Sequence, residues 1–312
     1  MEQYFLGYAS LEQQRWMVAD KVRTDAFAKA IFEVVHPGDL VIDVGAGTGI
    51  LSMLAAKAGA KRVIGIERSD MAVLAKELVK KNNLQNQVEI FHGDASDLML
   101  DEKADVIISE WLGHMAYVER MFHSVIDVRD KHLKPGGIML PSSVNVMLAP
   151  IDDGEYYKKE GPGFWEQDKI HGIDFSSFTK KEHEMGYSNL LHVPSKFLLC
   201  PGQTIHYQKM IDARPGDEWC MSSVDFTIER DGTLNGLVGW FSTELSHSTV
   251  LDTAPHLPRT HWAQTYFPYY PMKVKKGEVV HVDYQINESY EGSRLLEIIL
   301  RIGRHEINFI VT

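Results

Sequence analysis

The apolar positions of the first 141 residues alternate between two spacings, which together predict an α/β domain. Residues 10–35 place apolar side chains three and four positions apart and stop at His36-Pro37-Gly38, which is typical of a helix that ends at a turn. Short apolar runs then alternate with helical segments: runs at 40–44, 62–66, 88–92 and 106–109, and helices at 51–58, 71–82 and 117–133. Strands that alternate with helices predict a doubly wound, Rossmann-like parallel sheet.

After residue 141 the pattern changes to β-branched and aromatic runs separated by Gly, Pro and Asp turns. Strands are expected at 144–149, 197–199, 204–207, 222–228, 233–242, 279–286, 295–302 and 306–311. Residues 142–312 are therefore expected to form a second domain, an antiparallel β-barrel or sandwich. Within it, residues 155–187 are aromatic and charged with more helical than strand character. This stretch is a candidate surface for contact with another protein.

Composition and charge narrow the class of protein. The N-terminus has no basic region that leads into an apolar run, and Asp43 and several glycines interrupt the most apolar stretch, at 41–60, so no signal peptide or membrane span is expected. The two cysteines lack metal-ligand spacing, which favours a reducing compartment (the cytoplasm, with the nucleus as a second address) and predicts no metal site. A net charge of −11 argues against direct binding of nucleic acid and favours a basic partner, although solubility alone would also explain it.

The ends of the first three predicted strands resemble a site for a nucleoside. The first strand continues into the glycine turn Asp43-Val44-Gly45-Ala46-Gly47-Thr48-Gly49, where glycines allow a ligand to approach the backbone closely. Its G-x-G-x-G spacing differs from the G-x-G-x-x-G of dinucleotide sites and suits S-adenosylmethionine (AdoMet), which has no pyrophosphate. Glu67 ends the second strand, where a carboxylate accepts hydrogen bonds from ribose hydroxyls. Asp94 and Ser96 follow the third, and either is a candidate for the adenine amino group.

Two glutamates flank the loop after the fourth predicted strand. Glu110 lies at the strand's end and Glu119 just beyond the loop, at the edge where open α/β sheets bind ligands. Two carboxylates at one edge repel each other unless a cation lies between them. A guanidinium fits that position because it is planar, always protonated and able to pair with two carboxylates. The pair therefore predicts a site for an arginine side chain.

These motifs resemble those of the protein arginine methyltransferases, and the resemblance extends over nearly the whole chain. Ser109-Glu110-Trp111-Leu112-Gly113 with Glu119-Arg120-Met121 resembles the family's double-glutamate loop, and residues 43–52 match its first motif. Tyr4-Phe5-x-x-Tyr8 resembles the helix that covers the cofactor. Residues 20–24 resemble the segment that supplies an arginine to the cofactor's carboxylate, and Thr260-His261-Trp262-x-Gln264-Thr265 resembles the substrate loop of the second domain.

The resemblance implies a set of roles for individual residues. Catalytic roles are expected for Glu110, Glu119, His261 and Asp20. Contacts to AdoMet are expected from Tyr8, Met17, Arg23, Asp43, Gly45, Gly47, Thr48, Glu67, Asp94, Ala95, Ser96, Glu110 and Met121. Contacts to the substrate are expected from Tyr4, Tyr8, Glu110, Glu119, His261 and Trp262. His261 has two open interpretations, a proton acceptor oriented by Asp20 or a structural link between the domains.

The resemblance also implies the reaction and the assembly. Methyl groups pass from AdoMet to arginines of basic Gly/Arg-rich or histone-like proteins, with mono- and asymmetric dimethylarginine as expected products. Residues 155–187 resemble the family's dimerisation arm, which predicts an isologous homodimer. Gln14 departs from the family, where many members carry His, and residues 93–96 lack the usual glutamate. Two alternatives stay open: a methyltransferase for small molecules or nucleic acid, and a catalytically silent partner of an active enzyme.

Overall fold

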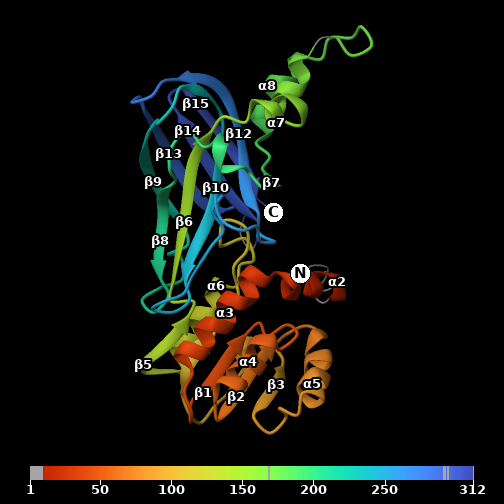
Figure 1. Ribbon diagram of the computed structural model, residues 1–312, viewed down its shortest axis with the longest axis vertical. Coiled ribbons are helices and arrows are strands. Elements are labelled where there is room, and N and C mark those ends of the chain that lie inside the picture. Colours follow the sequence, from red (N-terminus) through yellow and green to blue (C-terminus); the bar gives the residue numbers. More distant parts are fainter. Residues whose placement is uncertain (1–9, 168, 291–292, 294, 312) are drawn as a thin grey trace.

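The computed structural model describes residues 10–167, 169–290, 293 and 295–311 and consists of an α/β half and an antiparallel half (Figure 1). The parallel sheet has the order β3-β2-β1-β4-β5, with strands β1 (Leu40–Val44), β2 (Arg62–Glu67), β3 (Val88–His92), β4 (Ala104–Ile108) and β5 (Leu133–Leu140). Its connecting helices are α4 (Ile50–Ala58), α5 (Met71–Lys81), the short η1 (Ala95–Asp97) and α6 (Phe122–His132). The predicted Rossmann-like sheet is confirmed.

Two further helices lie between this sheet and the antiparallel half (Figure 1). Helix α2 (Leu11–Ala19) begins at Ser10, whose side chain accepts a hydrogen bond from the backbone of Gln13. Helix α3 (Lys21–Val34) begins at Asp20, which accepts from the backbone of Arg23 at 3.0 Å. Such side chains satisfy backbone donors that a helix N-terminus leaves unpaired. Asp20 therefore separates two helices and fixes where α3 starts.

The antiparallel half contains two sheets that face each other, which confirms the predicted second domain of strands. One has the order β7-β12-β10-β6-β8, with β11 paired to β10, and the other has the order β15-β14-β13-β9. The first comprises β6 (Ser143–Ile151), β7 (Asn189–Leu191), β8 (Gln203–Lys209), β10 (Gly232–Glu244), β11 (Val250–Asp252) and β12 (Gln264–Val274). The second comprises β9 (Cys220–Thr227), β13 (Val279–Glu288), β14 (Leu296–Ile302) and β15 (His305–Val311).

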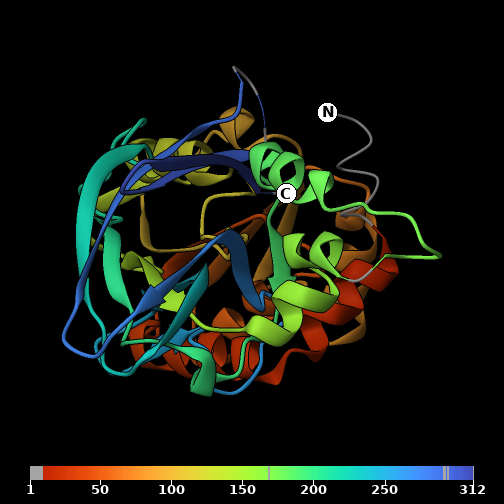
Figure 2. The same cartoon turned by 90° about the horizontal axis from the view of Figure 1, so that it is seen from above.

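A helical arm projects from the antiparallel half (Figure 1). It contains α7 (Gly154–Lys159), η2 (Pro162–Glu166) and α8 (Ser177–Met185). Helix α8 ends at Gly186, which has φ +57° and whose backbone accepts a hydrogen bond from Ile310 N of β15. Viewed from above, the arm and helix α2 lie on the same side of the molecule (Figure 2). No helix within the described part of the chain is both long enough and apolar enough to cross a membrane.

Several parts of the chain differ from the expectation. Residues 264–274 were not among the expected strands, yet they form β12 inside the sheet, where Pro268 pairs with Gly236 next to a register shift in β10. Residues 197–199 do not form a strand. Phe197 ends the short helix η3 (Ser195–Phe197), and Leu198 makes one isolated β-bridge with Ile151. Helix α6 begins at Phe122 rather than at 117, because the preceding residues form the loop of the candidate site.

Candidate active site

A cavity of about 160 Å³ opens at the carboxyl edge of the parallel sheet, beside helices α2 and α3. The strand ends of β1, β2 and β4 converge there, so residues far apart in the sequence share one wall. The predicted site residues that line it are Met17, Arg23, Gly45, Gly47, Thr48, Glu67, Asp94, Ala95, Glu110 and Met121. Further lining residues include Gln14, Val18, Arg68, Ser69, Arg120 and Ser124.

The glycine turn forms the floor of this cavity. Gly45 has φ +76° and Gly47 has φ +54°, a conformation that costs other residues free energy. A Cβ atom at Gly45 would lie 2.6 Å from Cε of Met121, so no side chain fits there without displacing that methionine. The amides of Gly45 and Ala46 both donate to the carbonyl of Ile66, which fixes the turn against β2. The turn thus leaves space for a ligand close to the backbone.

Glu67 is held rigidly at the end of β2. Its Oε2 accepts from the Gly47 amide at 2.8 Å, and its Oε1 accepts from the amide and hydroxyl of Ser69 at 2.7 and 2.6 Å. Each carboxylate oxygen has two lone pairs, so both positions of Oε1 are used and Oε2 keeps one. Glu67 lines the cavity, and this remaining position suits a ribose hydroxyl.

At the end of the next strand, β3, only one of the two residues predicted for the adenine site lines the cavity. Asp94 lines the cavity, whereas Ser96 does not and instead donates to Asp94 Oδ1 from its amide at 3.0 Å and its hydroxyl at 2.8 Å. Arg68 lies 3.2 Å from the other oxygen of Asp94. The hydrogen bond from the Ser96 amide is the main cause that lowers the pKa of Asp94, so this carboxylate is an ionised acceptor at neutral pH. Ser96 orients Asp94 from outside the cavity.

Asp43 also lies outside the cavity, behind the glycine turn. Its Oδ2 accepts from the hydroxyl of Ser52 on α4 at 2.6 Å. Burial raises the pKa of Asp43 to about 6. Its contribution to a cofactor site would therefore be indirect, through the link between β1 and the helix that follows the turn.

Arg23 and Glu110 form a buried ion pair at the inner end of the cavity. The Arg23 Nη2 and Nε atoms donate to Glu110 Oε2 at 2.5 and 2.9 Å, and both side chains are only 7% exposed. Glu110 Oε1 accepts from the Leu112 amide at 3.2 Å, and Arg23 also donates to the carbonyl of Met17. Sequence reasoning placed the two residues at one site but did not predict that they pair.

The loop from 110 to 121 folds back on itself and brings Glu119 beside Gly113. The amides of Gly113 and Ala116 each donate to the other's carbonyl at 3.0 Å. Met115, Ala116 and Arg120 have φ between +49° and +66°, a strained conformation for residues with side chains. A Cβ at Gly113 would lie 2.8 Å from Cγ of Glu119, so the glycine makes this close approach possible. Glu119 itself does not line the cavity.

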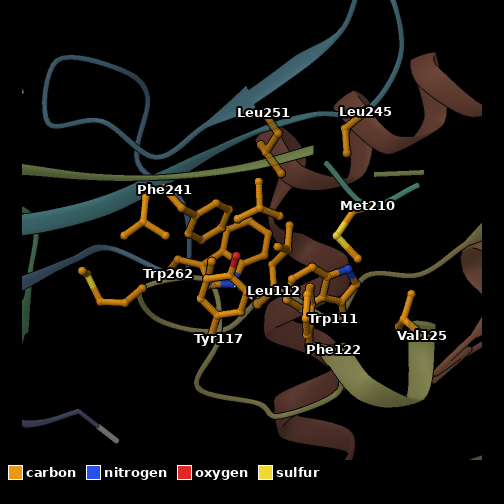
Figure 3. Close-up of a cluster of buried hydrophobic side chains, with 14 of the residues drawn as sticks. Trp111, Leu112, Tyr117, Phe122, Val125, Met210, Phe241, Leu245, Leu251 and Trp262 are labelled. Carbon is orange, nitrogen blue, oxygen red and sulfur yellow. Dashed lines mark hydrogen bonds between the residues drawn. The ribbon is translucent and has the colours of Figure 1, made fainter. Parts of the chain in front are cut away.

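The antiparallel half holds this loop in place. The Trp262 indole donates from Nε1 to the carbonyl of Leu112 at 2.5 Å, and His114 Nδ1 lies 3.1 Å from the carbonyl of Trp262. Burial lowers the pKa of His114 to about 4, so the ring is neutral and donates from Nδ1 to that carbonyl. Trp262, Leu112 and the neighbouring Trp111 belong to one buried apolar cluster (Figure 3). The two hydrogen bonds join the loop and residues 260–262 in both directions.

Asp20 and His261 make a second connection between the halves. Asp20 Oδ2 accepts from the backbone amide of His261 at 2.8 Å and lies 2.8 Å from its ring Nδ1. Burial disfavours the charged form of Asp20, but the hydrogen bonds from His261 and Arg23 outweigh it and lower the pKa of this carboxyl. An ionised Asp20 only accepts, so Nδ1 carries a proton and Nε2 is the free basic atom of a neutral ring.

Arg120 is a residue that sequence reasoning did not assign. Its Nη1 donates to Glu288 Oε1 at 2.6 Å and to the carbonyl of Ser293, and its guanidinium lies 5.3 Å from the centre of the Trp219 ring. All three partners come from the antiparallel half, 99 or more residues away in the sequence, so no local pattern signals them. Tyr4 and Tyr8, which were expected to cover the cofactor and contact substrate, lie outside the described residues.

Comparison with known proteins agrees with this geometry. Residues 23–144 match the family model of ribosomal protein L11 methyltransferase, and residues 142–304 match the arginine methyltransferase oligomerization subdomain. The chain is 31% identical to probable protein arginine N-methyltransferase 6 of Arabidopsis thaliana, over 98% of this chain and 80% of the relative. It is 35% identical to histone-arginine methyltransferase CARMER of Drosophila grimshawi, over 89% of this chain and 53% of the relative.

Solved structures give the same result. The Trypanosoma brucei PRMT1 enzyme-prozyme heterotetrameric complex with AdoHcy contains a chain with a TM-score of 0.90 and 29% identity, and the match covers 98% of this chain and 99% of that one. Protein arginine methyltransferase 10 of Arabidopsis thaliana has a TM-score of 0.88 and 30% identity over 99% of this chain and 100% of its own. The chain belongs to the protein arginine N-methyltransferase family.

As an arginine methyltransferase, the chain uses AdoMet to methylate arginine in protein substrates. The cavity fits that cofactor, because the Gly45 turn leaves no room for a side chain, Glu67 offers acceptors and Arg23 offers a buried cation for a carboxylate. An arginine methyltransferase also needs a separate site for the acceptor guanidinium. Glu110 borders the cavity, and the loop that follows it brings Glu119 back beside Gly113.

Proposed function

We propose that Glu110 and Glu119 hold the acceptor guanidinium and that the remaining site residues hold AdoMet. The observation that carries the proposal is the buried Glu110 carboxylate, which borders the cofactor cavity and is fixed by Arg23 and the Leu112 amide. Arg23, Glu67 and Asp94 are assigned to the carboxylate, ribose and adenine of AdoMet. Met17, Gly45, Gly47, Thr48, Ala95 and Met121 complete that surface.

The two glutamates would act by electrostatic preorganisation. When bound, AdoMet supplies a methyl group attached to a positively charged sulfur. A protonated guanidinium is a poor nucleophile because its lone pairs are delocalised over three nitrogens. Carboxylates at Glu110 and Glu119 attract the positive charge toward the nitrogens they hold, which leaves the remaining nitrogen more nucleophilic. Burial of Glu110 and Trp262 keeps water away from this charge pattern and strengthens it.

His261 is proposed to accept the proton that leaves the methylated nitrogen. Its hydrogen bond to Asp20 fixes the tautomer with the proton on Nδ1, which leaves Nε2 as the atom that can accept a proton. The same bond also attaches residues 260–262 to helix α3. The contact between Asp20 and His261 is therefore compatible with both interpretations of His261, as a proton acceptor and as a structural link between the halves.

The expected product is mono- and asymmetric dimethylarginine on basic, Gly/Arg-rich or histone-like proteins. Relatives named histone-arginine methyltransferase support histone-like substrates and hence action in the nucleus, and the cytoplasm is proposed as the main location on the sequence alone. The test is incubation of the isolated protein with labelled AdoMet and a Gly-Arg-rich peptide, followed by mass spectrometry of the methylarginines. Asymmetric dimethylarginine is the expected result. Symmetric or only monomethyl product would contradict the proposed specificity.

The same assay tests the second candidate, a catalytically silent partner. The observation that favours it is that a structural relative of this chain is described as an enzyme-prozyme heterotetrameric complex. One observation argues against a silent partner: the residues proposed to bind cofactor and substrate are retained around one cavity, namely Arg23, Glu67, Glu110 and the glycine turn. Methyl transfer by the isolated protein would exclude the silent partner, whereas activity that requires an added second chain would support it.

The assembly is proposed to be an isologous homodimer in which the arm, residues 155–187, docks on the α/β half of a second subunit. Exposed apolar side chains support this. Ile173 of the arm is 58% exposed, and Trp16 and Leu11 on helix α2 are 56% and 69% exposed. The arm and α2 lie on the same side of the molecule (Figure 2), as an interface that repeats by two-fold symmetry requires. Contiguous exposed apolar surface marks protein contact sites, and Leu11 and Trp16 lie on one short helix.

Ile173→Asp and Trp16→Asp are each expected to weaken the dimer at least about tenfold, because an unpaired carboxylate buried at the interface costs more than about 1.4 kcal/mol. Sedimentation should give twice the 35.4 kDa chain mass for the wild type and the single mass for the variants at low micromolar concentration. Met99→Asp is the matched control, since Met99 is 86% exposed and lies away from both segments in the loop before β4. A monomeric wild type would refute the proposed assembly.

A further inference from the structure

Glu33, on the last turn of helix α3, binds the hairpin between β10 and β11. Its Oε1 accepts from the hydroxyls of Ser248 at 2.5 Å and Thr249 at 3.3 Å, and its Oε2 accepts from the hydroxyl of Ser246. Lys29 Nζ lies 3.5 Å from the carbonyl of Ser248. The hydrogen bonds from Ser246 and Ser248 lower the pKa of Glu33, so the carboxylate is ionised at neutral pH. These four side chains, Glu33, Ser246, Ser248 and Thr249, are called the hydroxyl latch below.

Helix α3 therefore contacts the antiparallel half at both ends. Asp20 binds His261 at the N-terminus and Glu33 binds the hairpin at the C-terminus. At a rise of about 1.5 Å per residue, these contacts are about 20 Å apart. Asp20 and the loop contacts of Trp262 hold the antiparallel half near the active site, and Glu33 adds a contact at the far end of α3. The latch thus opposes rotation of the hairpin relative to the helix.

The hairpin is connected to the active site through the buried cluster in Figure 3. Leu245 and Leu251 flank the hairpin and belong to this cluster together with Phe241 and Trp262. The rings of Phe241 and Trp262 meet edge to face with centroids 5.2 Å apart. Trp262 in turn donates to the Leu112 carbonyl in the loop that carries both glutamates. A shift of the hairpin relative to α3 would therefore displace Trp262 and that loop.

We propose that the hydroxyl latch is a positioning device for methyl transfer: Glu33, through the hairpin, holds Trp262 and His261 in register with Glu110 and Glu119. Glu33 does not line the cofactor cavity, and its hydrogen bonds go to the hairpin, so we assign its effect to the geometry of the acceptor side. The inference rests on the proposed roles of Glu110 and Glu119. Loss of the latch is expected to lower kcat roughly tenfold, because displacements of about 1 Å at a reacting centre reduce rates by up to about 100-fold.

Glu33→Ala tests the proposal, with Asp25→Ala as its matched control. Asp25 is an exposed acid on the same helix, so the control removes the same charge without touching the hairpin. Glu33→Ala should lower kcat roughly tenfold and leave the AdoHcy Kd within about twofold of the wild type, while Asp25→Ala changes neither. Glu33→Gln keeps one acceptor oxygen and should recover part of the rate. Equal rates for Glu33→Ala and Asp25→Ala, or a loss of AdoHcy affinity as large as the loss of kcat, would overturn the proposal.

A double-mutant cycle separates positioning from general loss of stability. In a Trp262→Phe background the link from Trp262 to Leu112 is already broken, so adding Glu33→Ala should lower kcat by less than about twofold more. An unchanged roughly tenfold loss in that background would contradict the proposed route. Amide hydrogen exchange at residues 260–265 should be faster in Glu33→Ala than in Asp25→Ala without any substrate. Because exchange needs no methyl transfer, it tests the latch even if arginine peptides prove not to be substrates.

Discussion

Replacing Glu110 by Gln is expected to lower kcat by about 10²–10³-fold while the AdoHcy Kd changes by less than about threefold. Gln keeps the size of the side chain and an oxygen for the Leu112 amide, but it removes the negative charge that would attract the acceptor guanidinium. The cofactor contacts assigned to Glu67 and Asp94 do not involve this carboxylate, and the amide oxygen of Gln can still accept from Arg23, the residue assigned to the cofactor carboxylate. Single-turnover methyl transfer to a Gly-Arg peptide and calorimetric titration with AdoHcy measure the two quantities.

Glu110 also neutralises the buried Arg23, so the stability of the variant must be measured alongside its activity. Glu110→Asp preserves the charge and serves as the second variant: it should fold like the wild type and retain more activity than Glu110→Gln. Glu77→Gln, on the exposed face of α5, controls for the loss of an acid elsewhere in the same half. If a folded Glu110→Gln protein methylates the peptide at the wild-type rate, Glu110 does not hold the acceptor guanidinium as proposed.

Replacing Gly186 by Ala is expected to reduce the free energy of unfolding by about 4 kcal/mol or more, a loss reserved for severe steric conflicts. A Cβ at this position would lie 1.7 Å from the backbone oxygen of Asn308, and φ of +57° is unfavourable for alanine. Since Asn308 is in β15, this steric conflict can be removed only if the C-terminal end of α8 moves away from β15. Urea unfolding followed by circular dichroism measures the loss, and sedimentation should show that the dimer is lost with the arm.

Gly172→Ala is the matched control for Gly186→Ala. Gly172 lies in the same arm with φ +83°, but a Cβ there would meet no atom within 4 Å. It should cost only the backbone term, about 1 kcal/mol. Equal losses for the two variants would show that the contact with Asn308 relaxes easily and that the arm is not fixed to β15 at this point.

The α/β half was predictable because its pattern is local. Its central strands β1 and β2 are apolar runs bounded by turn residues and are buried on both faces, which is typical of a parallel sheet. Strand β5 was not among the expected strands, because Lys134-Pro135-Gly136-Gly137 within it is typical of a turn. Strand β12 was not among the expected strands. Its two prolines lack a ladder donor, which disfavours an internal strand, and Pro268 pairs with Gly236 next to a register shift in β10. The late start of α6 follows from the bonds between Gly113 and Ala116 and from the contacts of the loop with Trp262, which no helical periodicity reports.

The same distinction explains the site. Glu67, Asp94 and Glu110 follow strands of one parallel sheet, so their convergence can be deduced from chain order alone. The partners of Arg120 and Glu33 cannot, because they lie 168 residues away at Glu288 and 213 residues away at Ser246. Their pairing depends on how the two halves are oriented. The motifs around the glutamates supplied the family, and the structure supplied the contacts that fix those motifs in space.

Two hydrogen bonds join the loop to Trp262, from His114 to the Trp262 carbonyl and from the Trp262 indole to the Leu112 carbonyl, and they have a consequence for engineering. A chimaera that joins the N-terminal half of one relative to the C-terminal half of another would combine residues 110–121 of one protein with residues 260–265 of the other. These two segments need not form the hydrogen bonds that join them here. Such grafts should function only when residues 110–121 and 260–265 are exchanged as one unit, even though the crossover point lies between them.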